Sequence, residues 1–184
     1  RIESRGLGDV YKRQLINSLN LNLDSQIIDI GGGESRLVDN LLNIGYTNVT
    51  VLDISSKSIE KTKKRLGLKS KLVNWIVCDI NNFKPEHKYD LWHDRAAFHF
   101  LRDNSEIDNY LKLLKTFLNV NADLIIATFS ENGPLKCSGL EVSRYSKSSI
   151  SDLLSHDFEL ISTEISIHKT PFNTCLLYTS DAAD

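Results

Sequence analysis

The chain has 184 residues, of which 41% are apolar and 25% are charged, and its formal net charge is −2. These values are typical of one ordinary soluble domain, and the near-neutral charge speaks against a strongly basic nucleic-acid-binding protein. No apolar run approaches the roughly 20 residues of a membrane-spanning helix, and three scattered cysteines are too few for a disulfide framework or a zinc cluster.

The two ends of the chain differ from the sequence between them. Residues 1–14 have no clean helical or strand periodicity, and no methionine occurs anywhere. Residues 175–184 end without a helix cap or a completed strand pattern. Both ends resemble translated adapter sequence that flanks assembled environmental reads. We therefore expect non-native flanks at 1–14 and 175–184, and one domain at 15–174.

Short apolar runs alternate with helical patterns through the rest of the chain. Strands are expected at residues 26–30, 48–53, 71–78, 89–93, 123–129 and 158–168. Helices are expected at residues 34–43, from Ser55 or Ser56 to about 66, at 106–118 and at 148–156. This alternation predicts an α/β fold with a single doubly wound, mostly parallel sheet and helices on both faces. The least regular segment, residues 130–145, contains Gly133-Pro134 and is expected to be a long functional loop.

The first strand ends at a glycine run, Gly31-Gly32-Gly33, directly before a helix. Glycines allow the backbone to approach a ligand closely, and the start of a helix presents free N–H groups at the same place. The second strand ends in Asp53, about 20 residues later, where a carboxylate can accept both hydroxyls of a ribose. Together these features indicate a cofactor that contains a nucleoside.

The residues around the glycines narrow the choice of cofactor. A dinucleotide fingerprint requires glycine at its sixth position, which is Arg36 here. Asp29, two residues before the first glycine, suits a cationic amino-acid portion better than an anionic pyrophosphate. After the third strand, Asp79 can accept from the amine of an adenine, and Ile80 can cover its ring.

These residues resemble motifs one to four of class I S-adenosylmethionine-dependent methyltransferases: Asp29-x-Gly31-Gly32-Gly33, Asp53, Asp79 and residues 89–95. Three further segments, 94–101, 127–130 and 133–140, are similar to a subgroup of small bacterial methyltransferases with no assigned substrate. A more distant resemblance is to lysine methyltransferases. The resemblance covers about residues 22–173.

The resemblance implies a role for each matching position. The cofactor-binding residues would be Asp29, Gly31, Gly32 and Gly33 at the methionine portion, Asp53 at the ribose, Ile54, Asp79 and Ile80 at the adenine, and Asp94. Asp94, Arg95 and His99 would lie beside the sulfonium and the incoming acceptor as catalytic residues, with His99 as the candidate general base. No metal is expected.

Each assignment has a structural alternative. Asp29 could brace the glycine turn, Asp94 and Arg95 could form a mutual ion pair, and His93 is expected to be hydrogen-bonded within the fourth strand. The chain also departs from the family pattern. Residues 119–123 replace the usual Pro-Gly-Gly, and the C-terminal strand is expected to be truncated or replaced, although residues 175–179 are β-prone enough to fill its place.

The expected function is S-adenosylmethionine-dependent methyl transfer, by in-line displacement, to a small-molecule or protein (lysine) acceptor. The alternatives are a nicotinamide-dependent oxidoreductase, and a non-catalytic nucleoside-binding domain or inactive fragment. We expect a cytoplasmic protein without a nucleic-acid or membrane partner, and the sequence does not indicate its oligomeric state.

Overall fold

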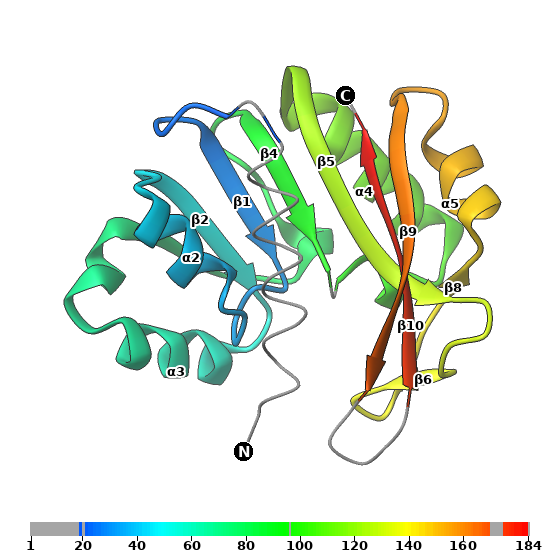
Figure 1. The fold of residues 1–184 in the computed structure, drawn as a ribbon, viewed down its shortest axis with the longest axis horizontal. Helices are drawn as coiled ribbons and strands as arrows, with labels where there is room; N and C mark the ends of the chain where they lie inside the picture. Colours follow the sequence, from blue (N-terminus) through cyan, green and yellow to red (C-terminus); the bar gives the residue numbers. More distant parts are fainter. Residues whose placement is uncertain (1–18, 20, 96, 170–174, 184) are drawn as a thin grey trace.

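The computed structural model describes residues 19, 21–95, 97–169 and 175–183 (Figure 1). The flank expected at residues 1–14 lies outside the described residues. Seven strands form the main path of the sheet in the order β3-β2-β1-β4-β5-β10-β9. Their bounds are β1 Gln26–Ile30, β2 Asn48–Asp53, β3 Val73–Val77, β4 Tyr89–Asp94, β5 Leu118–Ser130, β9 Leu160–Lys169 and β10 Cys175–Ala183.

The sheet is mostly parallel, as the sequence predicts. Strands β3, β2, β1, β4 and β5 pair parallel to their neighbours, whereas β10 is antiparallel to both β5 and β9. Strand order reverses between β1 and β4, so the carboxyl ends of these two strands form the topological switch point where ligands of such sheets bind.

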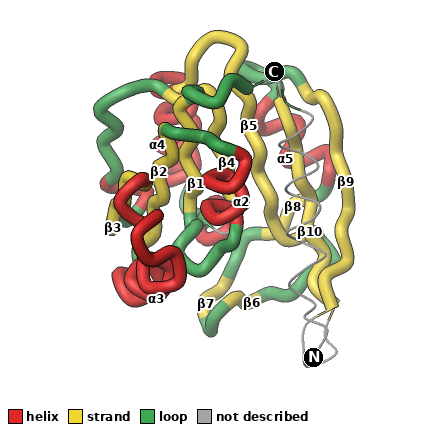
Figure 2. Tube along the Cα trace, turned by 60° about the vertical axis from the view of Figure 1, so that its left-hand side comes forward, coloured by secondary structure: helices red, strands yellow, loops and turns green. Residues whose placement is uncertain are grey.

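Helices cover both faces of the sheet (Figure 2). Their bounds are α2 Leu37–Ile44, α3 Ser56–Leu66, α4 Asn104–Phe117 and α5 Lys147–Leu154, with short 3₁₀ turns η1 Gly67–Leu72, η2 Ile80–Asn82 and η3 Phe98–Phe100. Leu37, Val38 and Leu41 of α2 pack with Ile27 and Leu91 on one face. Residues of α4 and α5 pack on the other face with the alternate strand positions, because successive strand residues point to opposite sides.

Several element boundaries differ from the sequence prediction for identifiable reasons. Helix α2 begins at Leu37 because the chain first makes a turn, in which the amide of Ser35 donates to the carbonyl of Gly32. Strand β5 begins at Leu118 rather than Asp123, because Leu118 already pairs with Tyr89 and the intervening residues form an irregularity in the ladder.

The C-terminal strand β10 lies between β5 and β9, which is the position expected to be truncated or replaced. The β-prone run at residues 175–179 is part of this strand, so this segment fills the expected gap. The loop after β5 is also more regular than expected. It contains a small hairpin, β6 Lys136–Cys137 and β7 Leu140–Glu141, and strand β8 Arg144–Tyr145, which pairs with β5.

Candidate active site

The glycine bend follows β1 at the switch point of the sheet. Gly31 has φ 70°, in the left-handed region that favours glycine. Its amide and that of Gly32 both donate to the carbonyl of Leu52 on β2, over 2.8 and 3.3 Å. These two bonds fold the bend back over the end of β2 and bring it toward the residue that follows Leu52.

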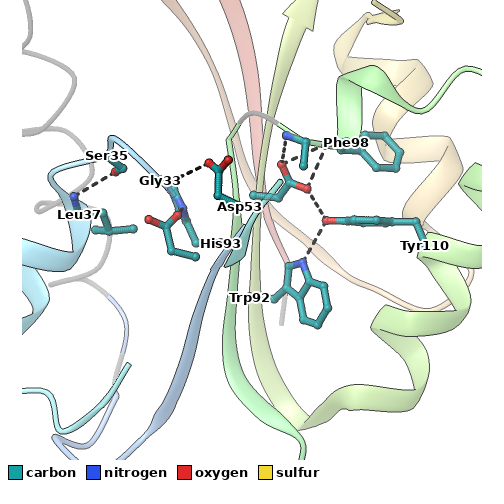
Figure 3. A network of polar contacts seen from close by, with 11 residues as sticks. Gly33, Ser35, Leu37, Asp53, Trp92, His93, Phe98 and Tyr110 are labelled. Atoms are coloured by element: carbon teal, nitrogen blue, oxygen red, sulfur yellow. Dashed lines mark hydrogen bonds and ion pairs between the residues drawn. The ribbon is translucent and has the colours of Figure 1, made fainter. Parts of the chain in front are cut away.

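That residue is Asp53, and its carboxylate contacts the glycine bend directly (Figure 3). Oδ2 accepts from the amide of Gly33 over 2.9 Å, and Oδ1 accepts from the amide of Ser55 over 2.7 Å. A Cβ atom at position 33 would clash with Oδ2 of Asp53. The structure therefore brings together the two features, the glycine run and Asp53, from which the sequence predicts a cofactor that contains a nucleoside. Asp53 is half-buried, and each carboxylate oxygen retains capacity to accept a further hydrogen bond.

Asp29 and His93 form a buried pair beneath the same bend. They are neighbours in register on β1 and β4, and Oδ1 of Asp29 lies 2.7 Å from Nδ1 of His93. Their side chains are only 2% and 4% exposed. The expectation that His93 is hydrogen-bonded within the fourth strand is confirmed, but the sequence did not identify its partner.

The residues expected at the adenine lie beyond β2 and β3. The amide of Cys78 donates to the carbonyl of Asp53, which holds the ends of the two strands together. Asp79 uses Oδ1 to cap η2 through the amide of Asn81. Ile54 is 71% exposed, whereas Ile80 is 7% exposed and packs into the core. Ile54 is thus open to a ligand, whereas Ile80 belongs to the hydrophobic core.

Asp94, expected beside the sulfonium, is fully buried, and its carboxylate is hydrogen-bonded to the protein. Its carboxylate accepts from the amides of Ala97 and Phe98 and from the hydroxyl of Tyr110, the last over 2.7 Å. The indole of Trp92 donates in turn to the Tyr110 oxygen over 3.0 Å (Figure 3). This network ties α4 to the segment after β4, so Asp94 holds the segment that carries His99.

Burial dominates the electrostatics of this network. It raises the pKa of the Asp94 carboxyl against the opposing effect of its hydrogen bonds. It also raises the pKa of Tyr110 well above its ordinary value, and the neighbouring Asp94 charge acts in the same direction. Tyr110 therefore remains a hydrogen-bond donor throughout the physiological pH range.

His99 on η3 is buried between aromatic rings. Its ring centroid lies 4.4 Å from that of Phe100 and 4.9 Å from that of Phe129. Neither ring nitrogen has a hydrogen-bond partner among the residues that the structure describes, and burial lowers the pKa of His99 to about 4. The imidazole is therefore neutral at pH 7, able to donate from one nitrogen and accept at the other. A group with so low a pKa is a weak base, so the expected role as a general base is weakened.

Two further buried hydroxyls lie at the carboxyl end of β5, on either side in sequence of Phe129, whose ring contacts His99. These hydroxyls, on Thr128 and Ser130, have no hydrogen-bond partner in the part of the chain that the structure describes. Arg95 is half-buried immediately after β4. Because buried polar groups are normally paired, the unpaired hydroxyls of Thr128 and Ser130 indicate a place where a ligand supplies the partners.

Among the described residues, no group of three or more His, Cys, Asp and Glu side chains could hold a metal ion. In the same part of the chain, no helix is both long and apolar enough to cross a bilayer.

Sequence reasoning missed two contacts of the site. Tyr110 lies within the helix expected at residues 106–118, and a buried tyrosine needs a partner for its hydroxyl, which here is Asp94. The pairing of His93 with Asp29 depends on the relative register of β1 and β4, which no local sequence pattern specifies.

Comparison with known proteins gives consistent matches. A family model described as a methyltransferase domain matches residues 27–121. Malonyl-[acyl-carrier protein] O-methyltransferase 2 of Ilyobacter polytropus is 31% identical over 107 residues, which cover 58% of this chain and 40% of the relative. N-terminal Xaa-Pro-Lys N-methyltransferase 1-A of Xenopus laevis is 28% identical over 102 residues, covering 54% of this chain and 45% of the relative. The matched part thus spans less than half the length of these relatives.

Solved structures share the fold. The 1,6-didemethyltoxoflavin-N1-methyltransferase of Burkholderia thailandensis, solved with S-adenosylhomocysteine, superimposes with a TM-score of 0.72 at 17% identity, covering 98% of this chain and 77% of that one. An S-adenosylmethionine-dependent methyltransferase of Leishmania major superimposes with a TM-score of 0.76 at 19% identity, covering 97% and 72% of the two chains.

Proposed function

Because this chain belongs to the methyltransferase-domain family, we propose that it transfers a methyl group from S-adenosylmethionine to an acceptor by in-line displacement. The observation that carries the proposal is the contact between the Gly33 amide and the Asp53 carboxylate. It unites a glycine bend and a ribose-binding acid at the switch point of a parallel sheet, where nucleoside cofactors of such folds bind.

Described residues at both ends of the candidate site support this proposal. Asp53 would accept the ribose hydroxyls, while Asp79 and the exposed Ile54 would contact the adenine beyond β3 and β2. At the other end, Gly32 packs directly against the carboxylate of Asp29, whose Oδ2 is buried without a partner among the described residues. A cation with donor hydrogens, such as the ammonium of the methionine portion, would satisfy that oxygen.

The bound cofactor would supply a methyl group that is already activated by the sulfonium. The protein therefore has to orient the acceptor and exclude water, and orientation alone can contribute about 7–11 kcal/mol. His99 would act as a neutral hydrogen-bonding group toward the acceptor, held in place by the segment that Asp94 anchors. The carbonyl of His99 also accepts from the amide of Ser143, which connects this segment to the loop after β5.

The acceptor is proposed only as a class. The relatives include enzymes named for O-methylation of a carrier-protein-bound malonyl group and for N-methylation of protein N-termini. A small molecule or a protein, including a lysine side chain, is therefore the proposed acceptor. The nicotinamide alternative gains no support from the site, because Arg36 occupies the position of the third fingerprint glycine, directly before α2.

Isothermal titration with S-adenosylhomocysteine tests the cofactor, and transfer of tritium from labelled S-adenosylmethionine into a cell lysate tests catalysis. We expect saturable binding and labelled product, with NAD giving no thermal shift. Binding without any label would support the alternative of a non-catalytic nucleoside-binding domain. A chain that binds NAD but not S-adenosylhomocysteine would refute the proposal.

A further inference from the structure

The buried pair of Asp29 and His93 has a geometry that a simple structural bridge does not need. Both residues lie on the sheet face that α2 covers, together with Ile27, Leu91 and Ile125, so an apolar layer surrounds them. Removing a carboxylate from water in such a place costs free energy unless each oxygen has a partner. Oδ1 has one in His93, at 2.7 Å.

The second oxygen, Oδ2, has no hydrogen-bond partner within the described part of the chain. It is directed at Gly32, where a Cβ atom would clash with both Oδ2 and Cγ of Asp29. A side chain at residue 32 would therefore displace this carboxylate, and only a glycine lets the bend pass directly over Oδ2. An ionised carboxylate can only accept hydrogen bonds, so Nδ1 of His93 must donate to Oδ1. This bond fixes the rotation of the carboxylate and therefore the direction in which Oδ2 points.

We propose that His93 is a positioning residue for the cofactor, which holds Asp29 so that Oδ2 receives the ammonium of the methionine portion. This inference rests on the proposed function. It adds a role for His93 on β4, which acts on the cofactor through Asp29 on β1. His93 does not touch the cofactor in this account. It selects for ligands with a cationic amino-acid end, because only such ligands provide the donor that Oδ2 lacks.

The test is a double-mutant cycle on the whole chain, with S-adenosylhomocysteine as the titrant. His93→Phe removes the donor but keeps a ring, and Asp29→Asn removes the charge. We expect His93→Phe to weaken binding by about tenfold to a hundredfold, as for hydrogen bonds to charged groups. In the Asp29→Asn background the same change should weaken binding by less than about twofold, since His93 acts only through Asp29.

Two comparisons separate positioning from loss of structure. His93→Asn presents an amide nitrogen near the position of Nδ1 and should recover most of the affinity. The ligand 5′-methylthioadenosine lacks the amino-acid portion, so its affinity should be the same in all His93 variants. His87→Phe is the matched control, because His87 lies exposed at the amino end of β4 and its substitution should not affect either ligand.

Equal losses for both ligands, or fully additive losses in the cycle, would overturn the positioning role. Unchanged affinity for S-adenosylhomocysteine in His93→Phe would also overturn it, while leaving the proposed function intact. A wild-type chain that binds neither ligand would instead refute the proposed function. If His93→Phe fails to fold, the comparison of His93→Asn with Asp29→Asn decides the question by the same criteria.

Discussion

The amide of Gly33 and the carboxylate of Asp53 lie 2.9 Å apart although 20 residues separate them in sequence. The contact depends on two strands that pair in register and on a bend that returns over the end of the second strand. A side chain at position 33 would disturb both the bend and the carboxylate of Asp53.

Gly33→Ala should remove cofactor binding while leaving the fold in place. The added Cβ would meet the carboxylate of Asp53 and the side chain of Ser58, so Asp53 would have to rotate away from the ribose position. Overpacking of this kind costs about 1–3 kcal/mol of stability. Titration with S-adenosylhomocysteine should give at least about a tenfold loss of affinity, equivalent to 1.4 kcal/mol.

The matched control is Gly67→Ala, because a Cβ at Gly67 would meet nothing within 4 Å. Its positive φ of 58° makes the substitution unfavourable for folding, but Gly67 begins η1, away from the bend. A similar loss of ligand affinity in both variants would contradict the proposed role of the Gly33–Asp53 contact.

Tyr110→Phe should lower stability and methyl transfer but not cofactor affinity. The change removes a donor from the buried Asp94 carboxylate and an acceptor from Trp92. An unsatisfied buried partner costs about 1–3 kcal/mol, more when it is charged. Urea unfolding should report this loss, and labelled transfer should fall because the segment that carries His99 loses its anchor. In the control Tyr46→Phe, outside this network, both quantities should remain near the wild-type values.

The free energy of unfolding should rise with pH between about 4 and 6.5, in part because of His99. Its pKa is lowered from 6.5 to about 4 in the folded chain, so the unfolded chain binds more protons in this window. The contribution of His99 to the free energy of unfolding is fully present above pH 6.5 and is lost as the pH falls to 4. It amounts to about 3 kcal/mol at most.

Unfolding of His99→Phe across this pH range checks the assignment. The variant should have a flatter pH profile than the wild type, because phenylalanine does not titrate. In His156→Phe the wild-type slope should remain, since the side chain of His156 is largely exposed. An unchanged slope in His99→Phe would show that another group causes it.

Thr128→Val should leave stability unchanged or raise it by about 1 kcal/mol, because it removes a buried hydroxyl that has no partner. The same substitution should reduce methyl transfer if this hydroxyl contacts the acceptor. Thermal unfolding and labelled transfer measure the two effects separately. A loss of stability of several kcal/mol would mean that the hydroxyl is paired in the protein and does not await a ligand.

The sequence predicted most of the fold because local patterns specify most of it. The bounds of β1 and β2 agree with the prediction, since each is a short apolar run that ends at a turn. The early start of β5 was not predictable, because Asn119, Val120 and Asn121 are exposed and show no strand periodicity. The early start comes from Leu118, which pairs with Tyr89 on β4.

The candidate site was likewise predictable from the sequence only in part. The meeting of Asp53 with the glycine bend follows from strand order and was predicted. The partners of Asp29 and Asp94 were not, because His93 and Tyr110 reach them through strand register and helix packing. Local sequence indicates that such polar side chains need partners, but it does not identify which residues provide them.

The most direct test of the account is titration of S-adenosylhomocysteine into the wild-type chain and into Asp53→Asn, with thermal unfolding of each. The asparagine retains one acceptor oxygen and nearly the same volume but loses the charge. We predict saturable binding to the wild type and at least about a tenfold weaker binding to the variant at comparable stability. Equal affinity in the two chains, or no binding to the wild type, would contradict the proposal that Asp53 and the glycine bend together bind the nucleoside.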